Sequence, residues 1–545
     1  MSLGTLSAPA DLRVTSAPAP GRAVTWLAVR QIRRGALIVV GLAAGMTALV
    51  AATYAQVMAD PAAAGSLQAL AGNPAIRTLF GAPIGLDTAG GFTVWRVGTV
   101  IAVLLGTWSI LATTRITRGE EDAGRWDLLL SSRLPAPAVL LRHLIPVMVV
   151  AAATATTIMA VLLLAGTEPA GALLHGTGTG LLGMFFAAVA ALAVQLFPAR
   201  SPATGTAVAV LGVSLLVRMI GDGVTALGWL LWLSPFGLLS HTGPYVHNRV
   251  PPLLLLAAAT ALLTVLALGV ARRRDVRDGL IPAAAGRRPR TLLLASAATF
   301  AVRRVLRPLA GWMLGIGAYY LLIGLTTVSV TDFLRDNPAM AGEASQAGFE
   351  ELGSTAGFAA TLFAILAMPA GGFVTVRMTA FLAAESDRRL TLLASQPITR
   401  LRLIGAEITV IAAAAAVLIT GAGLATWLGV TAIGGELAVT DALRGTWNVL
   451  PIVLLSLGAA VFAVGWAPRW TGLVGGLPTI GGFLLLVTAE SIAAPDWVRD
   501  LSPFAHLAPV PLTEASLATS AVMLALATLL TLLGIAAYRR RDLLS

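Results

Sequence analysis

Long uninterrupted apolar segments constrain this chain more than any other feature of its sequence. They recur along all 545 residues, each close to the ~20 residues that cross a ~30 Å hydrocarbon layer as a helix. Only 12% of the residues are charged, whereas soluble domains have about a quarter. In lipid every backbone polar group must be bonded internally, so only helices or closed barrels span it. Barrel strands would be about half as long. We therefore predict an all-α polytopic membrane protein.

The apolar segments form two sets of six, which predicts about twelve transmembrane helices. The first set covers residues 36–58, 94–114, 138–165, 174–197, 203–220 and 251–271. The second set covers residues 309–330, 356–376, 403–429, 446–466, 471–490 and 516–538.

Short motifs recur in the same order in both sets. Leu-Ser-Pro-Phe occurs at 233–236 and 501–504, Arg-Arg-Arg-Asp at 272–275 and 539–542, and related basic stretches at 28–34 and 301–307. Thr113 and Arg115, before Pro135, match Thr375 and Arg377, before Pro397. Four matches in register indicate two related six-helix halves, and an even number of spans gives both halves the same topology. The predicted domains are a disordered N-terminal tail at 1–21, a first half at 22–272, a cytoplasmic linker at 273–296 and a second half at 297–545.

The distribution of arginine orients the spans. If the N-terminus is cytoplasmic, the cytoplasmic segments hold 30 arginines and 11 acidic residues, and the outer segments hold 7 and 15. The positive-inside rule favours this orientation, with both termini in the cytoplasm. The net charge of +11 then faces anionic lipid headgroups. Because the arginines are dispersed over many loops, we expect no nucleic-acid partner.

Two residue types are missing altogether. The chain has no cysteine, which excludes disulfides and thiolate metal sites. It has no lysine either, so a conventional Walker A motif, whose lysine reaches the phosphates, is impossible. No histidine and carboxylate set has metal-ligand spacing, and no Ser/His/Asp set is evident. We expect no catalytic residue, no metal and no cofactor in this chain.

A basic amphipathic stretch precedes the first span of each half. It contains Trp26, Arg30, Arg33 and Arg34 in the first half, and Arg303, Arg304 and Arg307 in the second. This spacing is typical of an interfacial helix lying in the membrane plane. The alternative is an ordinary positive flank of a transmembrane helix.

The loop between the second and third spans has an acidic end and an apolar side. Thr117 and Glu120 have the spacing of a capping box, which predicts a short helix that Pro135 and Pro137 end. The predicted docking residues are Glu120, Glu121, Asp122, Gly124, Arg125, Trp126, Leu128, Leu129 and Pro135, with Leu130 on the same apolar side. The second half has a counterpart with Glu385, Asp387, Arg388, Leu392, Leu393 and Pro397. Such a helix is suited to docking on a partner protein, and the alternative is a solvated loop.

With these motifs, nearly the whole chain resembles the membrane subunit of an ABC exporter, from the bacterial group that exports polyketide antibiotics (tetronasin-type systems). In this family the two loops are coupling helices seated on ATP-binding subunits, and interfacial elbow helices open each half. Glu120, Glu121, Gly124, Arg125, Leu128, Leu129 and Pro135 match the family pattern, whereas only Glu385, Asp387, Leu392, Leu393 and Pro397 match it in the second half. The resemblance implies two copies of a separate ATP-binding subunit, which would hold ATP and Mg. It also implies export of apolar or amphipathic drugs, antibiotics or lipids across a bacterial plasma membrane.

The Leu-Ser-Pro-Phe motif lies on the outer side, before the last span of each half. Proline disfavours helical geometry in the residue before it, so the motif predicts a break suited to a re-entrant hairpin. The resemblance makes this an outer gate of Ser234, Pro235, Phe236, Ser502, Pro503 and Phe504. The alternative is a plain turn. Arg218, Glu407 and Glu490 lie near span ends, where we expect them to reach water.

Two other functions stay open from the residues alone. An ion-coupled secondary transporter of the major-facilitator type also has two six-helix halves, but it needs ionisable groups near the membrane midplane, and none is evident. A non-transporting membrane sensor or resistance protein would have no ATPase partner.

Overall fold

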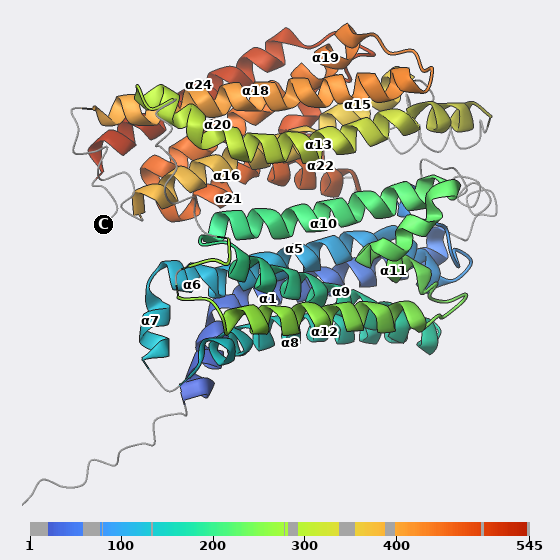
Figure 1. The fold of residues 1–545 in the computed structure, drawn as a ribbon. Coiled ribbons are helices and arrows are strands. Elements are labelled where there is room, and N and C mark those ends of the chain that lie inside the picture. The colour runs from blue at the N-terminus through green and yellow to red at the C-terminus, as the bar shows by residue number, and fades with distance from the viewer. Residues whose placement is uncertain are drawn as a thin grey trace, which may run out of the picture. The chain divides into compact units, whose positions relative to one another are not determined.

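A computed structural model describes residues 20–57, 77–78, 80–131, 134–276, 278–281, 293–336, 355–386, 398–491 and 495–541. All regular elements in these ranges are helices. The chain divides into two compact units, whose described parts are residues 20–281 and 293–541. Figure 1 colours the first unit from blue to green and the second from yellow-green to red.

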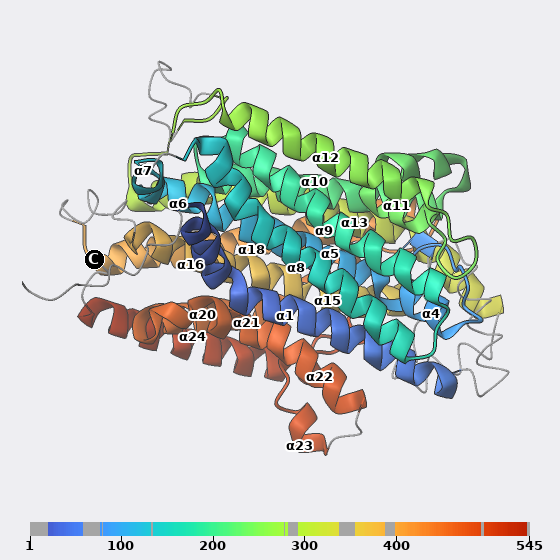
Figure 2. The ribbon, with the colours of Figure 1, turned by 90° about the horizontal axis from the view of Figure 1, so that it is seen from below.

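The first unit is built around six long helical segments. They are α1 (Pro20–Val57), the run from α4 (Ala89–Thr93) through η1 (Val94–Gly98) to α5 (Thr99–Ile116), α8 (Ala136–Leu164), α9 (Pro169–Leu196), α10 (Arg200–Gly223) and α12 (Pro251–Ala271). Shorter helices connect them, namely α6 (Arg118–Asp122), α7 (Arg125–Leu130), η2 (Thr225–Leu233) and α11 (Pro235–His241). Figures 1 and 2 show α6 and α7 at one end of this unit, the loop end, and α11 at the other end, the gate end.

The second unit repeats this order. Its long segments are α13 (Ala297–Asp336), α15 (Thr355–Ile365) with α16 (Ala367–Ser386), α18 (Arg400–Ala432), α19 (Val439–Trp447) with α20 (Leu450–Trp466), the run of α21 (Thr471–Gly476), η4 (Leu477–Gly481) and α22 (Gly482–Ser491), and α24 (Leu517–Arg540). Its short connecting helices are η3 (Pro468–Trp470), α23 (Asp496–Arg499) and η5 (Pro503–His506).

The transmembrane prediction is confirmed. Within the described ranges, eleven helices are long and apolar enough to cross a membrane. The twelfth expected segment, 471–490, coincides with α21, η4 and α22, which follow one another without a break. The π-helical turn η4 contains Pro478, whose ring cannot continue the regular α-helical bonding. The protein is therefore an all-α, multi-pass membrane protein.

The two units pack their long segments in the same order. In each unit the first segment packs against the third, and the fourth packs against the second and the sixth. The second and fourth segments are also the most buried, at 61% and 67% of the span in the first unit and 61% and 72% in the second, whereas every other span in the described residues is below 40%. The motif repeat in the sequence therefore corresponds to a repeat in packing.

Small residues allow these close helix contacts. A Cβ on Gly180 of α9 would lie 2.7 Å from the Cβ of Ala155 on α8. A Cβ on Gly458 of α20 would lie 2.5 Å from the carbonyl oxygen of Ala527 on α24. Lipid tails are as apolar as the helix surfaces, so the hydrophobic effect does not drive transmembrane helices together. Close packing at small residues supplies much of their association instead.

The basic stretches lie within the first helix of each unit. α1 and α13 run without a break from the arginines into the following span. Figures 1 and 2 show the first turns of α1 at an angle to the rest of the helix. Val24, Ala28 and Ile32 of α1 are buried in the unit, and the opposite face of the same turns exposes Trp26 and Arg30.

Candidate functional site

Loop 1, residues 117–135, joins the second and third segments at the loop end of the first unit. It forms two short helices, α6 and α7, which are separated by Ala123 and Gly124. Gly124 has φ 75°, a left-handed conformation that costs other residues about 1–2 kcal/mol. The expectation of one helix ended by Pro135 was wrong, because α7 already ends at Leu130 and Pro135 is the residue before α8.

The predicted capping box was also wrong. Thr117 is the residue that precedes α6, as expected, but its side chain does not cap the helix. The Thr117 hydroxyl instead donates a 2.5 Å hydrogen bond to the carbonyl oxygen of Thr113 in the preceding turn.

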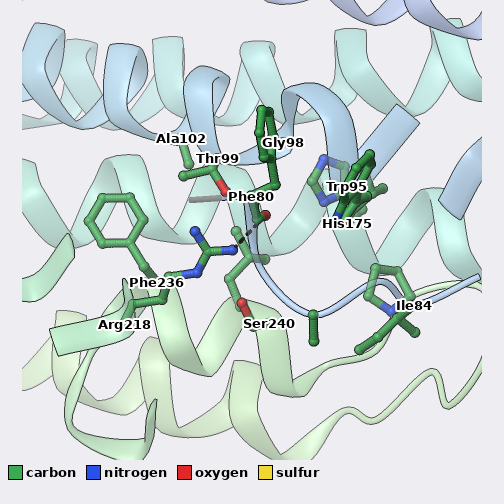
Figure 3. A pocket seen from close by; sticks show the side chains of 14 residues that line it. Phe80, Ile84, Trp95, Gly98, Thr99, Ala102, His175, Arg218, Phe236 and Ser240 are labelled. Carbon is green, nitrogen blue, oxygen red and sulfur yellow. Dashed lines mark hydrogen bonds between the residues drawn. The ribbon is translucent and has the colours of Figure 1, made fainter. Parts of the chain in front are cut away.

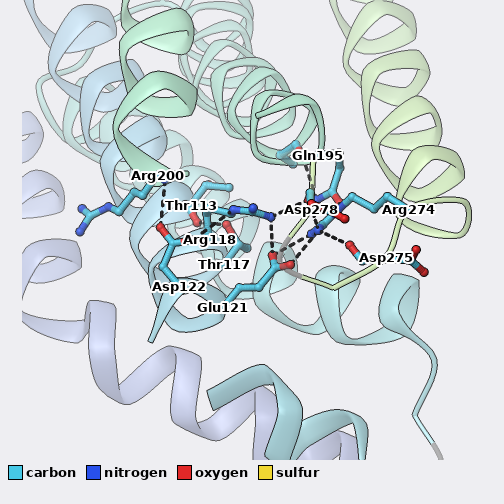
Figure 4. A network of polar contacts seen from close by, with 11 residues as sticks. Thr113, Thr117, Arg118, Glu121, Asp122, Gln195, Arg200, Arg274, Asp275 and Asp278 are labelled. Atoms are coloured by element: carbon cyan, nitrogen blue, oxygen red, sulfur yellow. Dashed lines mark hydrogen bonds and ion pairs between the residues drawn. The ribbon is translucent and has the colours of Figure 1, made fainter. Parts of the chain in front are cut away.

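Glu121 is the centre of a buried polar network (Figure 4). Arg274, just after α12, donates from Nη1 to Glu121 Oε1 and from Nη2 to Oε2, at 2.7 Å each. Arg118 Nη1 lies 3.1 Å from the same carboxylate and also donates to the carbonyl oxygen of Asp278. Arg274 Nε donates to Gln195 at the end of α9 at 2.5 Å. Loop 1 is therefore bonded to the ends of two transmembrane helices.

Asp122 and Glu120 of loop 1 make further polar contacts. Asp122 accepts a 3.0 Å hydrogen bond from the backbone amide of Arg200, the first residue of α10. Arg125 donates to both carboxylate oxygens of Glu120, at 2.5 and 2.7 Å, and these bonds raise the pKa of the Arg125 guanidinium. Loop 1 is thus also linked to α10.

The apolar side of loop 1 faces its own unit. Trp126 is 1% exposed and stacks on His143 of α8, with ring centroids 5.9 Å apart. Leu129 and Leu130 pack against the same buried cluster. Leu128 points the other way and is 75% exposed. The expectation that Glu120, Glu121, Trp126 and Leu129 face a partner is therefore corrected: Leu128 and the half-exposed Arg125 face outward.

The second unit has an equivalent link. Glu385, near the end of α16, is 4% exposed and accepts a 2.9 Å hydrogen bond from Arg541 Nη2, just after α24. Arg400 Nη1, at the start of α18, donates to the carbonyl oxygen of Arg541 at 2.5 Å. Arg541 is the counterpart of Arg274 in the sequence repeat, whereas Glu385 lies two positions beyond the residue that matches Glu121. The other predicted residues of this loop, Asp387, Arg388, Leu392, Leu393 and Pro397, lie outside the described residues.

The serines of the two Leu-Ser-Pro-Phe motifs make the same kinds of hydrogen bond, before an α-helix in the first unit and before a 3-10 helix in the second. Ser234 donates to the carbonyl oxygen of Ser214 at 2.7 Å, and its oxygen accepts from the amide of Gly237 at the start of α11. Ser502 donates to the carbonyl oxygen of Gly482 at 2.8 Å and accepts from the amide of Phe504. Each serine thus bonds to a carbonyl twenty residues earlier. Pro235 and Pro503 each begin the short helix that follows.

The phenylalanines of these motifs are buried in apolar clusters. Phe236 lies 5.6 Å from Phe186, and Phe504 lies 5.6 Å from Phe483, between ring centroids. Each motif therefore fixes a short helix against the transmembrane helices of its own unit.

Three charged residues that we expected to reach water or lipid lie in buried pairs. Arg218 is 4% exposed and its Nε lies 2.6 Å from Asp222. Glu407 is 2% exposed and pairs with Arg304, so Arg304 is not a free basic residue of an interfacial helix. A charge buried in a membrane protein needs such a partner because its desolvation is costly. The Glu490 side chain lies outside the described part of the chain. The other predicted residues of the basic stretches are exposed, namely Trp26, Arg30, Arg33, Arg34, Arg303 and Arg307.

Sequence reasoning missed the partners of the loop residues. Arg274, Gln195 and Arg118 complete the network around Glu121, although Arg274 is 153 positions away in sequence. The sequence repeat does indicate these pairs, because both halves have a carboxylate in this loop and an arginine after the last span. Over the residues that the structure describes, no group of three or more His, Cys, Asp or Glu is placed to hold a metal ion.

Comparison with known proteins identifies the family. The model of the family described as "Multidrug efflux system permease Rv1217c, C-terminal domain" matches residues 24–272 and 294–539. The chain belongs to this family. It is 33% identical over 515 residues to the multidrug efflux system permease protein Rv1217c of Mycobacterium tuberculosis (strain ATCC 25618 / H37Rv), which covers 93% of this chain and 91% of that protein.

The Rv1217c permease family accounts for the main architecture of the chain. The two matched segments each contain six long helical segments, and the residues between them, 273–293, begin within the Arg-Arg-Arg-Asp motif. The chain is a permease of this family, and Glu121 and Glu385 lie within the matched segments, whereas Arg274 and Arg541 each lie two residues beyond the end of one.

Proposed function

We propose that this permease is the membrane subunit of an ATP-driven exporter and that loop 1 docks on a separate ATP-binding subunit. The observation that carries the proposal is the link between Glu121 and Arg274, which recurs between Glu385 and Arg541. Two links support two docking sites, and hence two copies of the ATP-binding subunit. With no lysine in the chain, ATP and Mg would bind on those partners.

Loop 1 has the rigidity that a docking element needs. Its buried carboxylate Glu121 is paired with arginines of the same unit, and Trp126 packs the loop against His143 of α8. This leaves an outer surface of Ala123, Arg125, Asp127, Leu128 and Ser131, all exposed. An exposed leucine surrounded by polar groups is suited to a small apolar hollow on a partner, because binding there removes its apolar surface from water.

The hydrogen bonds of loop 1 connect it to three transmembrane helices, so movement of the loop would be transmitted to them. Displacement of the loop would pull on the end of α12 through Arg274, the end of α9 through Gln195 and the start of α10 through Asp122. Nucleotide that closes the ATP-binding dimer would then shift the permease between inward- and outward-open populations. The Ser234 and Ser502 helices would open and close the outer face.

The proposed setting is a bacterial plasma membrane with both termini in the cytoplasm, in contact with lipid. Most arginines then lie on the cytoplasmic side. The scarcity of charge in the spans supports an apolar or amphipathic cargo taken from the inner leaflet.

Inside-out vesicles test this proposal. The chain is co-expressed with the ATP-binding subunit that copurifies with it, and uptake of a fluorescent drug is followed with ATP alone or with a proton gradient alone. We expect uptake with ATP only, and its loss in Leu128→Glu but not in Leu164→Glu, an 88% exposed leucine at the far end of α8. Uptake that needs the proton gradient would instead show an ion-coupled transporter.

A further inference from the structure

A second polar site lies at the gate end of the first unit, away from loop 1. A partly open cavity of about 70 Å³ is lined by residues of η1, α5, α9, α10 and α11 and of the segment that precedes α4 (Figure 3). Its volume is several times the roughly 15 Å³ that one water requires. Its walls are mostly apolar, with the aromatic rings of Phe80, Trp95 and Phe236 among them.

The backbone at Phe80 and Gly81, beside the cavity, passes close to the guanidinium of Arg218. Arg218 Nη2 donates to the carbonyl oxygen of Phe80 at 2.9 Å, and Trp95 Nε1 donates to that of Gly81 at 3.1 Å. Gly81 has φ +99°, and a Cβ there would lie 1.9 Å from Arg218 Nη2. Only glycine therefore lets the chain pass this close to the arginine.

Two buried nitrogen atoms at the cavity have no hydrogen-bond partner in the structure. They are Nη1 of Arg218 and Nδ1 of His175, on side chains that are 4% and 3% exposed. Figure 3 shows the Arg218 guanidinium in the same space as Phe236 and Thr99, with His175 beside Trp95. Buried donors are almost always satisfied, so the unpaired Nη1 of Arg218, on a side chain that lines the cavity, indicates a missing acceptor. Nδ1 of a neutral His175 donates to an acceptor in one of its two tautomers.

The local charge favours an anion. Arg218 is paired with Asp222, and the charge of Arg77 also acts on the Asp222 carboxylate. Two guanidinium groups and one carboxylate leave a net positive charge beside the cavity, whose wall includes Arg218. In a medium of low dielectric constant, this charge attracts an anion more strongly than it would in water.

We propose that this cavity binds the carboxylate group of an amphipathic carboxylic acid. A carboxylate accepts hydrogen bonds from guanidinium in a fixed geometry, and its two oxygens suit two separate donors. The cavity holds only the acidic group, and Phe80, which is 40% exposed, borders the way in for an apolar chain. A free inorganic anion would lose its hydration without gaining the contact with the aromatic rings.

Site-directed photolabelling of the chain alone, in phosphatidylcholine nanodiscs, tests this site. The probes are decanoic acid and decanol that each carry a diazirine, and the labelled peptides are located by mass spectrometry. We expect the acid to label the peptides around Trp95 and Phe236 at least fivefold more than the alcohol does, and unlabelled decanoate to compete. No ATP-binding subunit is present, so failure here leaves the docking proposal untouched.

Three variants separate binding from folding. The Arg218→Gln/Asp222→Asn pair removes the guanidinium donor at the cavity while Arg77 keeps the net charge unchanged, and it should lower acid labelling to the level of the alcohol. Ser240→Leu, at the cavity wall, should also lower it, and the exposed Arg249→Gln should leave it unchanged. Each variant is accepted only if its melting temperature stays near that of the parent. Equal labelling by acid and alcohol, or no label at the cavity because it holds water alone, would overturn the proposal.

Discussion

Arg274 binds Glu121 through two parallel hydrogen bonds of 2.7 Å, which fix loop 1 to the residue that follows the last helix of the first unit. Both side chains are at least 95% buried. Neither group therefore exchanges freely with water, and each depends on the other for its charge balance.

The first prediction concerns this pair. Glu121→Gln leaves Arg118 and Arg274 buried without their shared carboxylate, and it should cost roughly 3–5 kcal/mol of unfolding free energy, as is usual when one partner of a buried pair is removed. Equilibrium unfolding in mixed micelles measures this cost. The Glu121→Gln/Arg274→Gln double variant should lose about 1–3 kcal/mol less than the sum of the two single losses. Simple additivity would show that the two residues do not interact.

The second prediction concerns the equivalent pair in the second unit. Arg541 Nη2 donates to Glu385 at 2.9 Å, a longer bond than the 2.7 Å bonds of Arg274, and its side chain is 14% exposed, compared with 5% for Arg274. The coupling energy between Glu385→Gln and Arg541→Gln should therefore be positive but smaller than in the first unit. The same unfolding assay measures it, and a larger value would contradict the geometry.

These pairs also show what the sequence reveals and what it leaves out. The spans and the repeat were predictable because ~20-residue apolar runs and repeated motifs are local signals. The inward orientation of Trp126 was not, because α6 and α7 are separate helices that meet at a left-handed glycine, and the turn at Gly124 sets the side that each residue faces. Burial of Glu407 and Arg218 was missed for a different reason. Each is paired with an arginine or aspartate, and the sequence pattern near a span end does not distinguish such a pair from an exposed charge.

The third prediction concerns Gly124. Its φ of 75° means that Gly124→Ala should cost about 1–2 kcal/mol and turn α7 away from its present direction. We expect drug-stimulated ATP hydrolysis by the assembled exporter to fall. Gly166→Ala is the matched control, because Gly166 also has φ 75°, lies between α8 and α9 and has nothing within 4 Å of a new Cβ. A similar loss of ATP hydrolysis in both variants would mean that strain alone, and not the position of α7, is responsible.

The fourth prediction concerns the two gate serines. Ser234→Ala and Ser502→Ala each remove a helix cap and a bond to a carbonyl twenty residues earlier, and each should cost about 1–2 kcal/mol of stability. Ser234→Thr, which keeps the hydroxyl, should recover part of the loss. Thermal unfolding in nanodiscs checks this, with Ser201→Ala as the exposed control. No change at either gate serine would show that these bonds contribute nothing to stability.

The docking of loop 1 is tested most directly by crosslinking. Because the chain has no cysteine, Leu128→Cys places a single reactive thiol at the outermost side chain of α7. Leu164→Cys places one at the opposite end of α8. A benzophenone maleimide on each variant is irradiated in membranes, and the crosslinked protein is identified by mass spectrometry and assayed for ATP hydrolysis. We expect an ATP-binding subunit to be captured at position 128 and not at position 164. Variants that still export drug but capture no ATP-binding subunit at position 128 would contradict the docking of loop 1.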